Sequence, residues 1–165
     1  MTTRLNIEDR VEADVSTVLA SYGVSNLHRM YAERTGSSEA VGVWCASIGD
    51  TFFGVNLPSG FVRASIVIDC STDLHDDPDG SALRALARTV REAWLRSDMV
   101  DTLNAMTSFA TYYGYERGIE ITPSPEDRRR HIEINGTLIM RPSDNSTTTS
   151  TSSTSTVTTT STTTT

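Results

Sequence analysis

The stretch HDDPDGS at residues 75–81 holds the densest group of side chains that could bind a metal ion or exchange protons. Asp77, Asp79 and Gly80 match positions 3, 5 and 6 of a helix–loop–helix calcium loop. Positions 1 and 12 of such a loop require carboxylates, and here they are His75 and Leu86. Because both end ligands are missing, the stretch is better explained as a turn followed by the N-cap of a helix.

The other chemistry-bearing residues form no recognisable catalytic set. Cys45 and Cys70 lie in apolar alternating runs, where a free thiol is most often a small buried side chain. His28, His75 and His131 are far apart, and none stands at metal-ligand spacing from a cysteine. No G-x-S-x-G, G-x-x-x-x-G-K-S/T or H-E-x-x-H motif occurs. We therefore predict no catalytic residue, no metal and no cofactor, and a protein that is not an enzyme.

One basic run and one acidic region carry charges that could pair. Three consecutive arginines stand in EDRRRH at residues 126–131, and acids crowd the first predicted helix and the loop at 73–79. The arginines suit three roles: a solvated entrance to a strand, a phosphate contact, or a subunit contact with an acidic neighbour. The charged candidates for a subunit contact are Arg128, Arg129, Arg130, Asp76, Asp77 and Asp79.

Aromatic residues gather in two stretches that suit a protein interface. TSFATYYGY at 107–115 packs four aromatics into nine residues, most of them expected in the core or at a sheet edge. GDTFFGVNLPSG at 49–60 predicts a long loop or a hairpin with exposed aromatics. The aromatic candidates for a subunit contact are Tyr112, Tyr113, Phe52 and Phe53.

An amphipathic helix is predicted near the N-terminus. Apolar residues recur at helical spacing from Ile7 to Tyr22, and Asn6 can act as the N-cap. Gly23 stands where a C-terminal glycine ends a helix. The segment that follows, 27–34, is ambiguous and compatible with a short helix.

The rest of the chain predicts four strands and two further helices. Alternation of apolar and polar residues predicts strands at 41–48, 61–70, 115–121 and 128–140, the last two as an antiparallel hairpin. Helical spacing predicts a long helix at 81–96 and a short one at 98–106. These elements predict an α+β fold: a two-layer domain with a mainly antiparallel sheet of about four strands and two main helices on one face.

The C-terminal stretch differs in composition from everything before it. From Ser146 to Thr165 every residue except Val157 is Ser or Thr. We therefore divide the chain into one α+β domain at 1–143 and a Ser/Thr low-complexity arm at 144–165. The arm suits three roles: a passive terminus, a glycosylated stalk, or a segment that adds a strand to an exposed sheet edge of a neighbouring subunit.

Charge and hydropathy restrict the partners. The net charge of −7 argues against a general nucleic-acid binder, which needs clustered basic residues to displace counterions from phosphate. The N-terminus is acidic where a signal peptide would be apolar, and no apolar stretch approaches the length of a membrane span. We therefore expect a protein that folds in a cytoplasm and does not contact a membrane.

The order of the predicted elements resembles a known family. A capped amphipathic helix is followed by the apolar strand ASIVIDCSTD, the long helix ALRALARTVREAWL, the short helix DMVDTLNAM, and a closing hairpin that ends in HIEINGTLIM. Over roughly residues 6–142 this order is similar to the tail terminators and other neck or tail-completion proteins of tailed bacteriophages. The loop around 49–60 and the Ser/Thr arm depart from that pattern.

The resemblance implies a structural virion protein assembled in the host cytoplasm. It implies a homo-oligomeric ring, often a hexamer, that caps the tail tube, contacts neighbouring neck or tail-tube proteins, and lets DNA pass through its lumen. An acidic ring would repel DNA and let it slide. Two alternatives stay open: a small enzyme or ligand-binding domain with its site between the 71–80 loop and the 107–118 segment, and a capsid decoration protein with the arm pointing outward.

Overall fold

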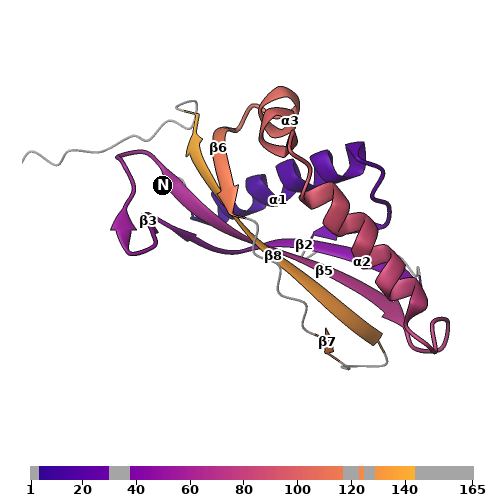
Figure 1. The fold of residues 1–165 in the computed structure, drawn as a ribbon. Coiled ribbons are helices and arrows are strands. Elements are labelled where there is room, and N and C mark those ends of the chain that lie inside the picture. The colour runs from indigo at the N-terminus through magenta and orange to yellow at the C-terminus, as the bar shows by residue number, and fades with distance from the viewer. Residues whose placement is uncertain (1–3, 30–37, 117–122, 125–128, 144–165) are drawn as a thin grey trace, which may run out of the picture.

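The computed structural model describes residues 4–29, 38–116, 123–124 and 129–143 of the 165-residue chain (Figure 1). Predictions for residues 1–3, 30–37, 117–122, 125–128 and 144–165, the arm among them, lie outside the described residues. The helices are α1 (Arg4–Ser21), α2 (Ser81–Trp94) and α3 (Met99–Met106). The strands are β1 (Leu27–Arg29), β2 (Glu39–Gly49), β3 (Thr51–Phe52), β4 (Val55–Asn56), β5 (Val62–Asp73), β6 (Ala110–Glu116), β7 (Pro123–Ser124) and β8 (Arg129–Pro142).

The main sheet is mixed and has more strands than the sequence indicates. Its strand order is β1-β2-β5-β8-β6, and β7 pairs with the other end of β8. All pairings are antiparallel except that of β1 with β2, while β3 and β4 form a separate hairpin. The α+β class is thus confirmed, but the expectation of about four strands is wrong because two- and three-residue strands leave no readable alternation.

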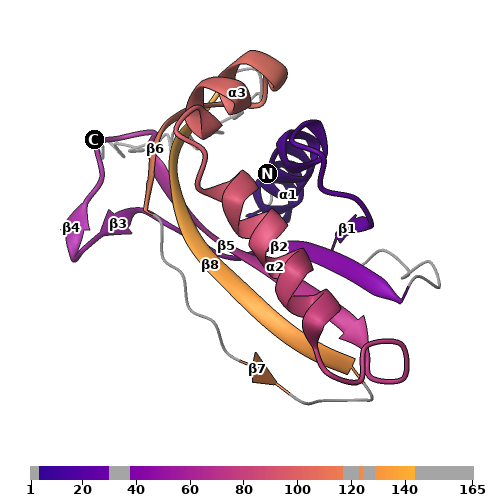
Figure 2. The same ribbon diagram turned by 45° about the vertical axis from the view of Figure 1, so that its right-hand side comes forward.

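The core lies between one face of the sheet and the three described helices (Figure 2). Register places the inward side chains of the three long strands in rows, such as Val43, Ile68 and Ile134. Onto these rows pack the apolar stripe of α1, the apolar stripe of α2 and Leu103 of α3. The opposite face, called the outer face below, is turned away from all three of these helices.

Two expectations about local structure are corrected near the N-terminus. Helix α1 begins at Arg4, so Asn6 lies inside the helix and is not its N-cap. The three-residue segment Leu27–Arg29 is a strand and not a helix, because it pairs with β2 through register partners such as His28 and Gly42. The predicted stop is confirmed: Gly23 has φ 88°, and the Val24 N–H donates to the Leu19 carbonyl.

The closing hairpin is confirmed, although its first strand begins earlier than predicted. Strand β6 starts at Ala110, and it pairs antiparallel with β8. The strand therefore contains Tyr112 and Tyr113, while Ile119 and Ile121 of the predicted strand lie outside the described residues.

Helix α2 packs very closely on the centre of β8. Gly136 lies on the inward face in register with Ile66, and a Cβ there would be 2.4 Å from Cζ2 of Trp94. Trp94 is completely buried. The absence of a side chain at Gly136 is what lets the indole lie directly on the strand backbone.

Side chains from two helices occupy the edges of the main sheet. On the β2 edge, just beyond the pairing with β1, the Cys45 N–H donates to Oε1 of Glu12 at 3.0 Å. On the β6 edge, Asn104 both accepts from the Tyr112 N–H and donates to the Tyr112 carbonyl, each at 2.8 Å. These side chains take the hydrogen bonds that an added strand would use.

Candidate assembly surface

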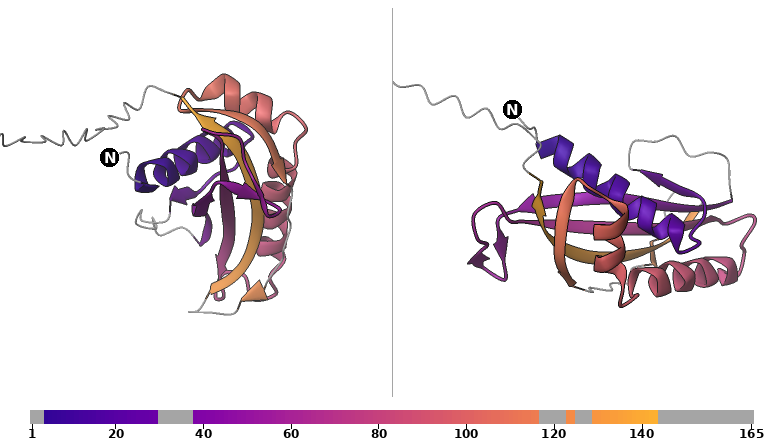
Figure 3. Two further views of the ribbon diagram at one scale, coloured as in Figure 1. Left: turned by 90° about the vertical axis from the view of Figure 1, so that its left-hand side faces the viewer. Right: turned by 90° about the horizontal axis from the view of Figure 1, so that it is seen from above.

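The β3–β4 hairpin is the most exposed apolar feature of the described chain. Only Phe53 and Gly54 separate its strands, and both have positive φ values, 50° and 77°. The Phe53 side chain is 76% exposed and Val55 is 69% exposed. The hairpin projects from one end of the molecule, and the loop before α2 lies at the opposite end (Figure 3).

More aromatic surface adjoins the base of this hairpin. The rings of Phe61 and Tyr113 contact each other in a tilted arrangement with their centroids 5.0 Å apart, and Tyr113 is 55% exposed. Phe52 packs against Phe53 with ring centroids 4.3 Å apart. The prediction of a hairpin with exposed aromatics is therefore confirmed, and Tyr113, a candidate for a subunit contact, is exposed. We call the residues Phe52, Phe53, Val55, Phe61 and Tyr113 the aromatic end.

Arg63 of β5 lies beside the aromatic end, on the outer face of the sheet. It is the register partner of Gly49, and one of its terminal nitrogens would lie 3.5 Å from a Cβ at that glycine. Among the described residues its guanidinium has no carboxylate within ion-pair distance, and its buried Nε has no acceptor. The sequence does not mark Arg63 as a candidate, because only the strand register reveals what surrounds it.

The acidic loop before α2 serves the fold of its own subunit. Asp77 is 3% exposed, and its carboxylate accepts hydrogen bonds from the N–H groups of Ala82 and Leu83 and from the Thr72 hydroxyl. Burial acts to raise the pKa of Asp77, but these hydrogen bonds outweigh it and hold the pKa below its ordinary value. The turn before α2 is thus confirmed, and Asp77 binds the first N–H groups of the helix, although the N-cap residue is Gly80 and makes no side-chain capping hydrogen bond. The subunit-contact role of Asp77 is wrong, because the side chain is buried.

The other members of the charged candidate set are partly occupied within the chain. Asp79 accepts from the Ser81 N–H, and Asp76 is exposed. Arg130 donates to the Pro78 carbonyl at 2.7 Å, and Arg129 donates to the Ser38 carbonyl at 3.0 Å. Arg128 lies outside the described residues. Arg129 and Arg130 therefore bind backbone carbonyls in loops of their own subunit.

No protein-family model matches this chain, and no curated protein matches it. In the described part, no helix is long and apolar enough to cross a bilayer. The same residues contain no group of three or more His, Cys, Asp or Glu side chains that could hold a metal ion.

Tyr112 is an internal residue and not part of an interface. It is 1% exposed, and its hydroxyl donates to Oδ2 of Asp14 at 2.7 Å. Burial raises the pKa of Asp14, and the hydrogen bond from Tyr112 opposes that shift. The interface role proposed for Tyr112 is therefore wrong. Because successive side chains of a strand point to opposite faces, Tyr113 is exposed where its neighbour Tyr112 is buried.

A histidine–aspartate pair on the outer face was not found from the sequence. Nδ1 of His131 lies 3.0 Å from both carboxylate oxygens of Asp69, which is 3% exposed. Such a pair can orient a catalytic base when a nucleophile stands beside it. The nearby hydroxyl of Ser71 is fully buried and has no hydrogen-bond partner among the described residues, so a substrate cannot reach it. The pair therefore supports strand packing better than nucleophilic catalysis.

The two cysteines are equally unsuited to catalysis. Burial raises the pKa of both thiols to about 12, so thiolate is negligible at neutral pH. Cys45 and Cys70 lie on the same face but are register partners of Ile66 and Val41, which places another pair of residues between them.

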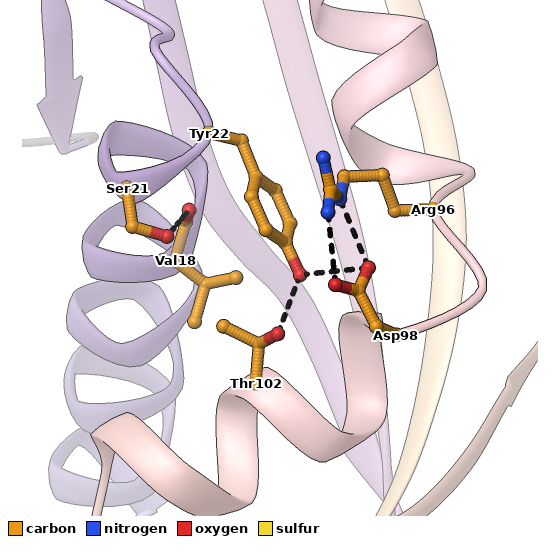
Figure 4. A network of polar contacts seen from close by, with 6 residues as sticks. All are labelled: Val18, Ser21, Tyr22, Arg96, Asp98 and Thr102. Atoms are coloured by element: carbon orange, nitrogen blue, oxygen red, sulfur yellow. Dashed lines mark hydrogen bonds and ion pairs between the residues drawn. The ribbon is translucent and has the colours of Figure 1, made fainter.

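A polar network fixes the end of α1 against the junction of α2 and α3 (Figure 4). The Tyr22 hydroxyl lies 2.7 Å from Oγ1 of Thr102 and 3.3 Å from Oδ1 of Asp98. Arg96 donates two hydrogen bonds of 2.9 Å to Asp98. Its Cζ lies over the Tyr22 ring, 4.3 Å from the ring centroid. The paired guanidinium lowers the pKa of Asp98.

Tyr22→Phe should lower the free energy of unfolding by about 1 kcal/mol, because it removes one part-buried hydroxyl with its contacts to Thr102 and Asp98 and keeps the ring under Arg96. Urea denaturation of the variant beside Tyr113→Phe, which loses an exposed hydroxyl, measures the difference. Equal midpoints for the two variants would contradict a stabilising role for this network.

Proposed function

We propose that the protein is a structural subunit that assembles with copies of itself into a ring. The ring is of the kind that closes the tail tube of a tailed bacteriophage, joins it to the neck and lets DNA pass through the lumen. The subunit would be assembled in the host cytoplasm and remain in the virion. The single observation that carries the proposal is the exposed Phe53 at the tip of the hairpin.

The conformation of Phe53 supports this role. A bulky residue at φ 50° costs about 1–2 kcal/mol, and two-residue turns of this kind favour Asn, Asp or Gly. Within the subunit the ring gains a contact with Phe52 but remains 76% exposed. Local folding therefore does not explain the aromatic side chain, whereas burial against a second protein would offset both the strain and the exposure.

The rest of the candidate surface is consistent with assembly. A ring subunit needs two contact regions, and the aromatic end supplies apolar side chains that project beyond the core. The net charge of −7 suits a lumen that DNA traverses without binding. The rival site between the 71–80 loop and the 107–118 segment gains no support from Asp77 and Tyr112, because both are occupied in holding the subunit together.

The test compares the wild-type chain with Phe53→Asp by light scattering after gel filtration and by electron microscopy of particles. We expect rings from the wild-type chain and monomers from Phe53→Asp. Asn56→Asp adds the same charge at an exposed residue of the same hairpin and should still form rings. A wild-type chain that stays monomeric at high concentration, or a Phe53→Asp chain that assembles normally, would refute the proposal.

A further inference from the structure

We infer that adjacent copies join head to tail through an ion pair between Asp50 of one copy and Arg63 of the next. This inference rests on the proposed ring and names the two surfaces that meet in it. Asp50 begins the hairpin segment, and Arg63 lies on the outer face near the hairpin base. The partner of each surface is therefore a second copy of this chain.

Arg63 stands apart from the other arginines for which the structure gives contacts. Arg29 and Arg96 form ion pairs of 2.8 and 2.9 Å with carboxylates, and Arg129 and Arg130 donate to backbone carbonyls. The Arg63 side chain is half-buried and has no ion-pair partner among the described residues, and its buried Nε, like that of Arg129, has no acceptor. A guanidinium in this state lacks the carboxylate that its geometry can bind at two points.

Asp50 offers the complementary charge. It is exposed, and the described residues give its carboxylate no hydrogen bond or ion pair. Its backbone carbonyl accepts from the Leu57 N–H at 2.7 Å, which fixes the position of the residue at the start of the hairpin. An unpaired carboxylate and an unpaired guanidinium therefore lie at the same end of each subunit.

In the proposed ring these two groups pair between copies. Arg63 lies on the outer face of β5 in register with Gly49, and Asp50 follows Gly49 in the connection between β2 and β3. Among the described residues no ion pair joins Asp50 and Arg63 within one copy. Subunits of a closed ring contact each other head to tail, so each contact can bring the Asp50 of one copy to the Arg63 of the next.

Apolar surface at the same end supplies part of this contact. At exposures of 76%, 69% and 55%, Phe53, Val55 and Tyr113 present roughly 300 Å². A standard interface buries about 800 Å² per partner, so these three side chains form its apolar centre and the polar hairpin residues form the rim.

Charge reversal with mixing tests the inference. Asp50→Arg alone places two arginines opposite each other at every contact, and Arg63→Glu alone places two carboxylates there. We expect each variant to weaken ring formation by about tenfold or more. In an equal mixture every contact between unlike copies joins opposite charges, so rings of alternating copies should form again. Arg91→Glu and Asp101→Arg, which reverse exposed charges on α2 and α3, should assemble alone.

The outcomes separate this inference from the proposed function. Wild-type rings with a mixture that fails to assemble would overturn the Asp50–Arg63 contact and leave the ring standing. Wild-type monomers would overturn the ring itself. Circular dichroism of each variant, together with Arg63→Lys, distinguishes lost contacts from lost folding. The lysine variant keeps the charge but not the two-point geometry, so it should retain more assembly than Arg63→Glu and less than the wild-type chain.

Discussion

Replacing Gly136 by valine is expected to destabilise the subunit by about 3 kcal/mol, because the new side chain must occupy the space of the Trp94 indole. A Cβ at this position would lie between 2.4 and 2.8 Å from three atoms of the ring. Trp94 is fully buried, so it cannot swing into solvent without opening the core. Either α2 moves away from β8 or the strand bends, and both leave apolar surface poorly packed.

Chemical denaturation followed by tryptophan fluorescence measures this loss. Thr137→Val, at the adjacent outward position of the same strand, is the matched control and should change stability by less than about 1 kcal/mol. Gly136→Ala should lower the free energy of unfolding less in a Trp94→Phe background than in the wild-type chain, because the smaller ring leaves room for the methyl group. Additive effects of these two substitutions would show that the two residues do not share the strain.

The second large effect is expected from Tyr112→Phe, which should lower the free energy of unfolding by about 2 kcal/mol at pH 7. The variant keeps the ring in the core but removes the 2.7 Å hydrogen bond to the Asp14 carboxylate. A hydrogen bond to a charged, partly buried group contributes more than a neutral one. Denaturation of Tyr112→Phe, Asp14→Asn and the double variant measures the coupling between the two residues.

This loss should depend on pH in a defined direction. Burial raises the pKa of Asp14 above its ordinary value of 3.8, so the folded protein prefers the protonated carboxyl. The contribution of Asp14 to stability is therefore most favourable below pH 3.8 and decreases as the pH rises through the folded pKa. Without the Tyr112 hydroxyl the folded pKa rises further, so the defect should be larger at pH 7 than at pH 3. A defect that is constant with pH would contradict the role of the charged form.

Helices and long strands could be predicted because their periodicity is written in consecutive residues. The stripe of α1 and the alternation in β5 each extend over many residues, and both elements are present. Strand β1 could not be predicted, since three residues carry no measurable alternation and its formation depends on β2. The start of α1 was also missed, because the apolar stripe marks the buried turns and not the first turn.

The candidate surface was predictable in part. The sequence of the hairpin contains turn residues and two adjacent phenylalanines, which suffices to predict exposed aromatics. The opposite burial of Tyr112 and Tyr113 follows from the alternation of side chains in β6, a strand that the sequence predicted to begin only at residue 115. Neighbouring strands decide which residues lie side by side. The lack of an ion-pair partner for Arg63 among the described residues and the contact between Asp69 and His131 both depend on that register. Register between strands is a tertiary property, so sequence pattern alone could not supply it.

The side chains of Glu12 and Asn104 have a consequence for how copies of this chain can grow into larger objects. Sheets with two open edges can join edge to edge without limit, which yields insoluble fibres. Here a carboxylate blocks one edge at Cys45, and an amide blocks the other at Tyr112. Polymerisation through backbone ladders is therefore interrupted on both sides, and association is directed to contacts of finite number, even at the protein concentrations of a crowded cell.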